Sequence, residues 1–441
     1  MTNVTPEATS RAIHEPGEVT VFGLPDHTGR WLFVFVGLII NICLGTVYAW
    51  SVFRGPIARQ FSTAEIPITA KQTLWPFMLF LAVFTALMPI AGRIIQKVHP
   101  RIVSLVGSVI VCAGWILSSY ANDMNFLYVT YGIIAGAGVG IVYGIPIAVT
   151  TRWFPDLKGL AVGITVSGFG VSALVTAPLA QALIQNNGVL STFFTLGVAF
   201  LVMLVPLSLV LRFPPEGWQP ENWKGAAAAK EQDFTTAEMV RTPAGLGLWL
   251  CYIIGALSGL MSIGISSSVA QEIIRLDAVT AAGLVSFFAV FNGAGRPIFG
   301  WLTDAIGPSL AAALSFLLIL LASVGMLLAG EGNVLLYAVC FCAFWMALGA
   351  WLAIAPTTTA IFFGRRNYAA NYGVVFSAYG IGAIGGGLIA GSAKDIFGSY
   401  LFAFWVTGAL AAVGIIVALA LLKKPQEIEA LPYPGAVVRR S

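Results

Sequence analysis

The stretch AVTAAGLVSFFAVFNGAGRPIFGWLT, residues 278 to 303, is long and apolar enough to cross a membrane as a helix, and it contains one charge, Arg296. A cation inside hydrocarbon costs about 2.5–3.5 kcal/mol on insertion scales, so an intramembrane Arg is normally buried against a partner, here expected to be an anion. Pro297 removes a helical hydrogen bond and disfavours the helical conformation at Arg296. Gly293 and Gly295 allow neighbouring segments to approach closely. A kink at this point would line a cavity.

The composition is that of a polytopic membrane protein. The 441 residues are 58% hydrophobic and only 10% charged, which a soluble protein of this length could not hide from water. The net charge of +4 is small and the basic residues are dispersed, so nothing indicates binding to nucleic acid. The five cysteines lie in apolar runs at spacings that fit neither a zinc site nor a disulfide framework. We predict no metal and no cofactor.

Apolar spans recur along the chain, six before a polar segment and six after it. The predicted fold class is therefore all-α, with twelve transmembrane helices in two six-helix bundles. The spans cover residues 31–53, 72–92, 102–121, 126–150, 158–184, 190–211, 243–269, 278–303, 308–330, 333–362, 370–393 and 400–422. The predicted parts are a tail (1–30), an N-terminal bundle (31–212), a linker (213–242), a C-terminal bundle (243–422) and a second tail (423–441).

Two local signals refine this division. No charged residue lies between Lys158 and Arg212, a stretch that holds the fifth and sixth spans. The break between these two spans is placed at residues 185–188, QNNG, which read as a turn. In the linker, Thr235 and Glu238 have the spacing of a capping box, which predicts a short helix before Pro243.

Basic residues near the span ends indicate the orientation. With both termini in the cytoplasm, most of them lie inside. Those expected outside are Arg54, Arg59, Lys71, Arg275 and Lys394. The first outer loop, which holds three of these, is an exception to the positive-inside rule. With these boundaries Arg296 is the only one of the 23 basic and 19 acidic residues at membrane depth.

The two groups of spans look like copies of each other. Two related bundles that face each other place a substrate site between them, near the middle of the membrane. At an offset of 210 residues, Pro146, Gly163, Ser167 and Gly170 fall on Pro356, Gly373, Ser377 and Gly380.

Three motifs carry a family resemblance. GWLTDAIGPS, from residue 300, resembles the signature between the second and third helices of each half in the major facilitator superfamily. The first-half copy departs from that signature at Gln96 and His99. AGAGVGIVYGIPIAVTTRWFPDLKGLAVG (135–163) and DFTTAEMVRTP (233–243) resemble the oxalate:formate antiporter family, bacterial relatives of the monocarboxylate transporters. The resemblance assigns conformational gating to Gly300, Asp304 and Gly307.

The resemblance also implies a substrate site. Arg296 matches the family's transmembrane Arg in the eighth helix, whereas Tyr379 stands where the eleventh helix of that family carries a Lys that pairs with oxalate. The second cation is therefore missing. Asn292, one turn before Arg296, stands where the eukaryotic relatives have an Asp. The matching motifs place in the cavity the aromatic residues Tyr48, Tyr143, Phe169 and Phe376.

Structural roles remain open for each of these residues. Aromatic side chains in transmembrane helices commonly pack or anchor at the membrane interface. An intramembrane Arg can also be satisfied by helix carbonyls. The glycine runs near residues 136–140 and 380–387 need only close helix packing.

The function we predict is transport of a small monocarboxylate, of the lactate, pyruvate, acetate or formate type, by rocking of two bundles in a bacterial inner membrane. One buried cation suits one carboxylate better than the dianion oxalate. Because no His, Asp or Glu lies at membrane depth, a proton would travel with the substrate, and proton symport is favoured over anion exchange. We expect a single chain to function as a monomer in the lipid bilayer.

Two other classes of function are disfavoured. An intramembrane enzyme would need a nucleophile with a base, or a metal site, and His14, His27 and His99 all lie outside the spans. A sensor would be expected to carry a large soluble output domain, which neither the tails nor the linker provides.

Overall fold

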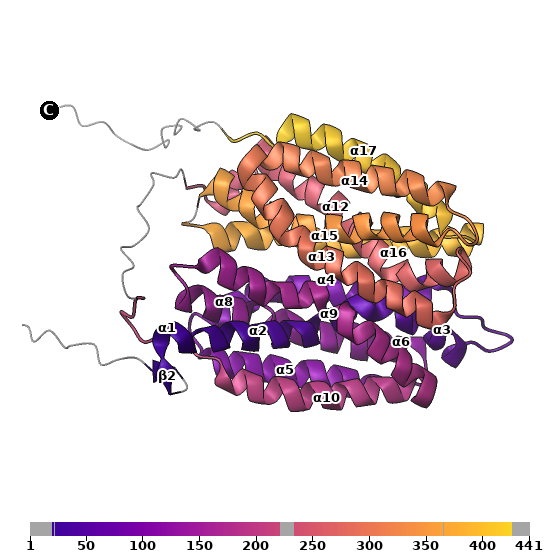
Figure 1. Cartoon of the computed structure of the whole chain (residues 1–441), viewed down its shortest axis with the longest axis horizontal. Coiled ribbons are helices and arrows are strands. Elements are labelled where there is room, and N and C mark those ends of the chain that lie inside the picture. The colour runs from indigo at the N-terminus through magenta and orange to yellow at the C-terminus, as the bar shows by residue number, and fades with distance from the viewer. Residues whose placement is uncertain (1–19, 22, 221–232, 365, 426–441) are drawn as a thin grey trace, which may run out of the picture.

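The computed structural model describes residues 20–21, 23–220, 233–364 and 366–425. Within them, twelve helices are long and apolar enough to cross a membrane, which confirms the predicted all-α fold class and the span count. Figure 1 shows the N-terminal half (indigo to magenta) and the C-terminal half (orange to yellow) as two helical bundles lying side by side. We call the end of the molecule where the described chain begins and ends the tail face, and the opposite end the far face.

In the N-terminal bundle, several spans are built from more than one helical segment. A short antiparallel pair, β1 (Thr20–Val21) and β2 (Leu24–Pro25), precedes it. The segments are α1 (Asp26–Gly29), α2 (Trp31–Leu44), η1 (Gly45–Ala49), α3 (Trp50–Phe61), α4 (Ala70–Ile94), α5 (Pro100–Ser118), α6 (Met124–Leu127), η2 (Tyr128–Ala135), α7 (Gly136–Val142), α8 (Gly144–Trp153), α9 (Lys158–Asn187) and α10 (Val189–Val210).

The C-terminal bundle has longer, uninterrupted helices. They are α12 (Pro243–Glu272), α13 (Ala278–Ile306), α14 (Pro308–Leu328), α15 (Val334–Phe363), α16 (Tyr368–Phe397) and α17 (Leu401–Leu421). Their outer surface is apolar, as a lipid-facing surface must be, and includes Leu328 and Leu335, which are 73% and 79% exposed.

The first span is longer than its apolar run predicted. Helical structure continues through α3 to Phe61, so Arg54 and Arg59 lie in a helix and not in the outer loop. Lys71 likewise lies in the first turn of α4. Arg54 is only 3% exposed. Arg296 is therefore not the only buried cation in a helix that could span a membrane.

Two predicted site residues lie where helices of the N-terminal bundle are irregular. Tyr48 lies in η1, a 3-10 segment, where the Thr46 hydroxyl donates to the Cys43 carbonyl at 2.9 Å and so competes with the regular ladder. Tyr143 lies between α7 and α8, and Pro146 beyond it cannot donate to the Val142 carbonyl.

Pro297 does not interrupt the helix that carries Arg296. α13 runs without interruption from Ala278 to Ile306, and Arg296 keeps a helical conformation. Packing of α13 against α9 and α15 holds the helix together, although Pro297 lacks the amide that would donate to the Gly293 carbonyl. The local preference of Pro297 against a helical Arg296 is therefore overridden by packing.

The two refining signals are confirmed. α9 ends at Asn187, and Gly188, with φ +80°, makes the turn into α10. In the linker, α11 (Thr236–Met239) is capped by the Thr235 hydroxyl and the Glu238 carboxylate. The backbone carbonyl of Phe234 accepts a hydrogen bond from Asn371 Nδ2 at 3.0 Å, so this end of the linker is docked on α16.

The internal repeat corresponds to equivalent packing positions. Gly170 on α9 faces α13, where an added Cβ would lie 2.8 Å from Asn292 Oδ1. Its counterpart Gly380 on α16 faces α4, where an added Cβ would lie 3.1 Å from Thr85 Cβ. Both interfaces join the two bundles.

Candidate functional site

Arg296 lies on α13 at the interface between the bundles. Small residues on either side of it let neighbouring helices come close: a Cβ added to Gly293 would lie 2.5 Å from Val171 of α9, and one added to Gly295 would overlap the Met346 carbonyl of α15. Arg296 itself is 8% exposed. The small residues around Arg296 therefore let α9 and α15 pack closely against α13 on either side of the cation.

Neutral groups are the only partners of Arg296 among the described residues. Its Nη1 donates to the backbone carbonyl of Val166, on α9 of the opposite bundle, at 2.7 Å. Its Nη2 makes a long contact of 3.4 Å with Asn292 Oδ1, and its buried Nε has no hydrogen-bond partner. The Asn292 amide is held in turn by donating to the Trp345 carbonyl at 3.0 Å. The guanidinium thus keeps unused donors for a further acceptor.

A pair of tyrosine hydroxyls bridges the bundles. Tyr48 from η1 and Tyr379 from α16 are hydrogen-bonded at 2.7 Å between their hydroxyl oxygens, and both side chains are buried. The Tyr379 ring stacks on Phe376 at 5.3 Å between centroids, and the Tyr48 ring meets Phe169 edge-on at 5.1 Å.

The remaining predicted aromatic residue closes the same group. Tyr143 lies 5.3 Å from Phe169, and its hydroxyl lies beside the guanidinium of Arg296. All the residues assigned to the substrate site thus meet around Arg296, contributed by both bundles. We call them the central cluster: Tyr48, Tyr143, Phe169, Asn292, Arg296, Phe376 and Tyr379.

Sequence reasoning missed three aromatic residues at this place. Phe84 of α4 lies at the centre of the rings, 5.1 Å from Tyr143 and 5.9 Å from Phe376. Trp345 lies 6.2 Å from Tyr48, and Tyr252 lies 6.4 Å from Tyr379. A hydroxyl far from either end of a span was a usable signal for Tyr252, whereas Phe84 resembles many other Phe residues in apolar runs.

The residues assigned to gating lie away from the central cluster, at the tail-face end of α13. Gly307, with φ +86°, makes the turn into α14 that the motif predicts. Asp304 is exposed, and its side chain makes no hydrogen bond or ion pair with the rest of the described chain. Its gating role stays a prediction.

The far face is closed by contacts between the bundles, and Arg54 is central to them. Its Nη1 donates to Ser268 Oγ of α12 at 2.9 Å, and its Nη2 donates to the Tyr400 hydroxyl at 2.9 Å. Within its own bundle it bonds to Thr73 Oγ1 at 3.1 Å and to the Ala70 carbonyl at 3.2 Å. No carboxylate of the described residues pairs with it.

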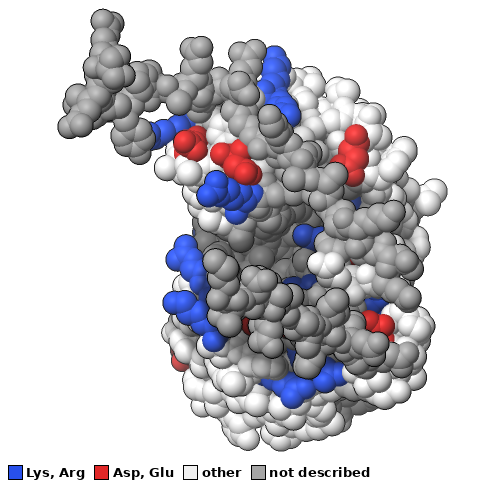
Figure 2. Space-filling model, turned by 90° about the vertical axis from the view of Figure 1, so that its left-hand side faces the viewer, with Lys and Arg blue, Asp and Glu red and all other residues white. Residues whose placement is uncertain are grey.

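Asp395 makes a second contact between the bundles at the far face, from the C-terminal bundle to the N-terminal one. Its carboxylate, on α16, accepts hydrogen bonds from the backbone amides of Ala70 and Lys71 at 2.8 and 3.1 Å. These amides begin α4 of the other bundle, where an anion is favoured by the free N–H groups and the helix dipole. The two contacts together form the far-face latch. In contrast, the tail face is recessed between the bundles, with basic side chains around the recess (Figure 2).

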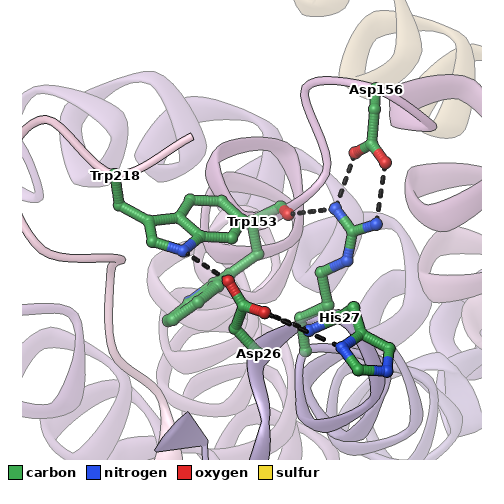
Figure 3. Close-up of polar contacts among 6 residues, drawn as sticks. Asp26, His27, Trp153, Asp156 and Trp218 are labelled. Carbon is green, nitrogen blue, oxygen red and sulfur yellow. Dashed lines mark hydrogen bonds and ion pairs between the residues drawn. The ribbon is translucent and has the colours of Figure 1, made fainter. Parts of the chain in front are cut away.

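On the tail face, the start of the first span is tied to the loop between α8 and α9. Arg30 makes two parallel hydrogen bonds of 2.7 Å to the carboxylate of Asp156 and a third, of 3.2 Å, to the Trp153 carbonyl. These bonds hold the pKa of Asp156 below its ordinary value, mainly because Arg30 donates to the ionised form. Figure 3 shows Asp156 at this contact and, beside it, Asp26 accepting from the Trp218 indole at 2.9 Å.

No group of three or more His, Cys, Asp and Glu side chains that could hold a metal ion occurs in the described part of the chain. The cysteines there are free and buried.

Comparisons with known proteins agree with this architecture. The family model of the Major Facilitator Superfamily matches residues 31–387. A solved structure of a bacterial homolog of the human lysosomal transporter Spinster, inward-facing and unoccupied, has the same fold, with a TM-score of 0.68 and 16% identity over 91% of this chain and 99% of that one.

Two of the curated relatives are named as transporters of carboxylates. The oxalate:formate antiporter of Oxalobacter formigenes is 29% identical over 394 residues, which cover 89% of this chain and 90% of that protein. Monocarboxylate transporter 13 of Rattus norvegicus is 26% identical over 407 residues, 90% of each chain. These matches confirm the family resemblance found in the sequence.

Proposed function

The chain belongs to the major facilitator superfamily, a family of membrane transporters and not enzymes, and on that premise we propose that it carries small monocarboxylates across a membrane by alternating access. The observation that carries the proposal is Arg296, a buried cation between the bundles with a free Nε and no carboxylate partner among the described residues. A substrate carboxylate would accept from two guanidinium nitrogens at once, an arrangement that Arg geometry favours.

The charge of the central cluster supports a monoanion. Arg296 is the only cation in the cluster, because the position where oxalate carriers have a Lys holds Tyr379. Arg54, another buried cation in a described span, is engaged at the far face by partners outside the cluster. A dianion at Arg296 alone would keep one uncompensated charge in an apolar chamber, a cost of several kcal/mol. Lactate, pyruvate, acetate and formate fit this restriction and oxalate does not.

Proton symport is the coupling we propose. The Val166 carbonyl gives Arg296 a partner from the opposite bundle when no substrate is bound, which lowers the cost of moving the empty site across the membrane. Return of the empty carrier is what a symporter needs and a strict exchanger avoids. The alternative is carboxylate exchange, which the similarity to the Oxalobacter antiporter favours.

We further propose that the tail face is cytoplasmic, that the protein lies in the bacterial inner membrane and that it works as a monomer. The basic side chains around the tail face in Figure 2 support this orientation.

Uptake of radiolabelled lactate and oxalate into proteoliposomes, with and without an inward proton gradient, tests the proposal. We expect lactate uptake that the gradient accelerates and a protonophore abolishes, with little oxalate uptake. Uptake that ignores the gradient but is accelerated by carboxylate loaded inside would establish exchange. Absence of carboxylate uptake under every condition would refute the proposed function.

A further inference from the structure

Tyr252 of α12 is a buried tyrosine without an assigned role. It is 0% exposed, and its ring stacks on Trp351 at 5.9 Å between centroids and 18° between planes. On the other side it faces the aromatic pair of α16, with ring centroids 6.4 Å from those of Phe376 and Tyr379. The ring is therefore fixed beside the central cluster.

The hydroxyl of Tyr252 has no hydrogen-bond partner. It lies beside the hydroxyl of Tyr372, but the two do not reach hydrogen-bonding distance and angle. It also lies near Arg296 and the hydroxyls of Tyr48 and Tyr143. A buried hydroxyl without a partner is unfavourable and uncommon, so we expect it to gain a hydrogen-bond partner when substrate is bound.

The donors without a partner beside the central cluster thus include the Nε of Arg296 and the hydroxyl of Tyr252, together with the indole N–H of Trp351. Plain carboxylates such as acetate have two oxygens, and the guanidinium can bind both. A ligand that also satisfied Tyr252 would need a third oxygen close to its carboxylate group.

Resting on the proposed function, we propose that Tyr252 is a specificity-determining residue whose hydroxyl hydrogen-bonds a hydroxyl or carbonyl oxygen on the carbon next to the substrate carboxylate. The site then prefers 2-hydroxy and 2-oxo acids to unsubstituted acids of the same size. A site that hydrogen-bonds a substrate oxygen rejects the analogue that lacks it, because the buried group is left unpaired.

Lactate and propionate differ by that one oxygen and test the proposal directly. Binding of each to the purified full-length protein is measured by competition against a radiolabelled monocarboxylate. Native protein should bind lactate about tenfold more tightly than propionate, as one hydrogen bond predicts. Tyr252→Phe should weaken lactate binding about tenfold and leave propionate within about twofold, so that the preference disappears. Its unfolding temperature without ligand should not fall, because the hydroxyl has no partner to lose.

Two control variants separate substrate binding from structure. Tyr131→Phe removes another fully buried hydroxyl without a partner, in the N-terminal bundle against Trp50, and should change neither affinity. Tyr372→Phe removes the neighbouring hydroxyl and should keep the preference for lactate. If Tyr372→Phe abolished the preference as Tyr252→Phe does, the two hydroxyls would act as a structural pair and the proposal would be wrong.

The outcomes also separate this inference from the proposed function. Equal binding of lactate and propionate by native protein, with both lost in Arg296→Gln, would overturn the role of Tyr252 and leave carboxylate transport standing. Binding of both acids by Arg296→Gln at native strength would refute the proposed function itself.

Discussion

Arg296 can donate five hydrogen bonds, and the described residues offer it one short acceptor, the Val166 carbonyl, and one long one, Asn292 Oδ1. A buried cation with so few partners is unfavourable in the empty protein. The free energy that a carboxylate recovers by pairing with it is available for binding. This makes the position of the guanidinium, and whatever fixes that position, the most sensitive feature of the site.

Gly170 fixes the position of the guanidinium. A Cβ at residue 170 would lie 3.1 Å from Arg296 Nε, tighter than ordinary contact. We expect Gly170→Ala to displace the guanidinium and weaken monocarboxylate binding about tenfold or more, with uptake reduced accordingly. Gly163→Ala, two turns earlier on α9 with open space around its Cβ, is the matched control and should bind normally. Equal affinities in the two variants would show that Arg296 is not held at this glycine.

Tyr379 tests the valence of the substrate. Tyr379→Lys places a second cation in the cluster, so oxalate binding should improve while monocarboxylates, facing two buried cations, should bind less well. The measurement is the ratio of oxalate to lactate affinity in native protein and variant. A reversal of preference is required, since a uniform loss would reflect damage to the fold. Tighter binding of oxalate than of lactate by native protein would contradict the one-cation reading.

Among single residues, the sequence identified those with an unusual feature. Arg296 was found by its charge, and Tyr379 and Asn292 by departures from a family motif. Phe84 and Tyr252 were missed because an aromatic residue in an apolar run carries no local sign of the side it faces. Only the fold brings Phe84 within 5.1 Å of Tyr143.

At the scale of elements, the boundaries follow from hydropathy except where a charge is buried. The apolar run of the first span ends before Arg54, yet α3 continues because Ser268 and Tyr400 of the other bundle satisfy the guanidinium. These partners lie more than 200 residues away in sequence, so no local pattern could reveal them. α13 stays unbroken for a similar reason, since packing on two sides outweighs the local effect of Pro297.

The far-face latch predicts a conformational shift. Arg54→Gln loses the charged hydrogen bonds to Ser268 and Tyr400, worth about 1.5–3 kcal/mol each, and should move the population towards an open far face by at least tenfold. Distances between spin labels at Gln60 and Val279, on the two bundles, should lengthen.

Arg59→Gln is the control for this shift. Arg59 lies on the same helix, is exposed and makes no hydrogen bond or ion pair with the described chain, so its removal should leave the label distances unchanged. If both variants behaved like native protein, Arg54 would not hold the far face closed.

The contact between Arg30 and Asp156 predicts a pH dependence of stability. Because the folded-state pKa of Asp156 is lowered, its contribution is fully present above the unfolded pKa of about 3.9 and is lost as pH falls through the folded value. Asp156→Asn should therefore lower the free energy of unfolding by about 1–2 kcal/mol at any pH from 5 to 8. The difference from native protein should shrink below about pH 4. Thermal unfolding across this range checks it, and a difference that changed between pH 6 and 8 would contradict the assignment.

At the scale of the whole molecule, the sequence predicted two related bundles with a site between them. Hydropathy and length determine the number of spans, and the repeat at an offset of 210 places Gly170 and Gly380 at equivalent interfaces. Which face is closed could not be predicted, because closure depends on a few contacts between bundles, such as those of Arg54 and Asp395. Both conformations of an alternating-access carrier share the same helices, so the local pattern is common to both.

Monocarboxylate transport at Arg296 is tested most directly by lactate uptake into proteoliposomes containing native protein, Arg296→Lys or Arg296→Gln, reconstituted in equal amounts. Native protein should take up lactate down an inward proton gradient. Lysine keeps the charge but loses the planar fork, so Arg296→Lys should retain only a small fraction of the rate, and Arg296→Gln should show none. Uptake by Arg296→Gln at the native rate would contradict the assignment and leave Arg296 a structural residue satisfied by the Val166 carbonyl.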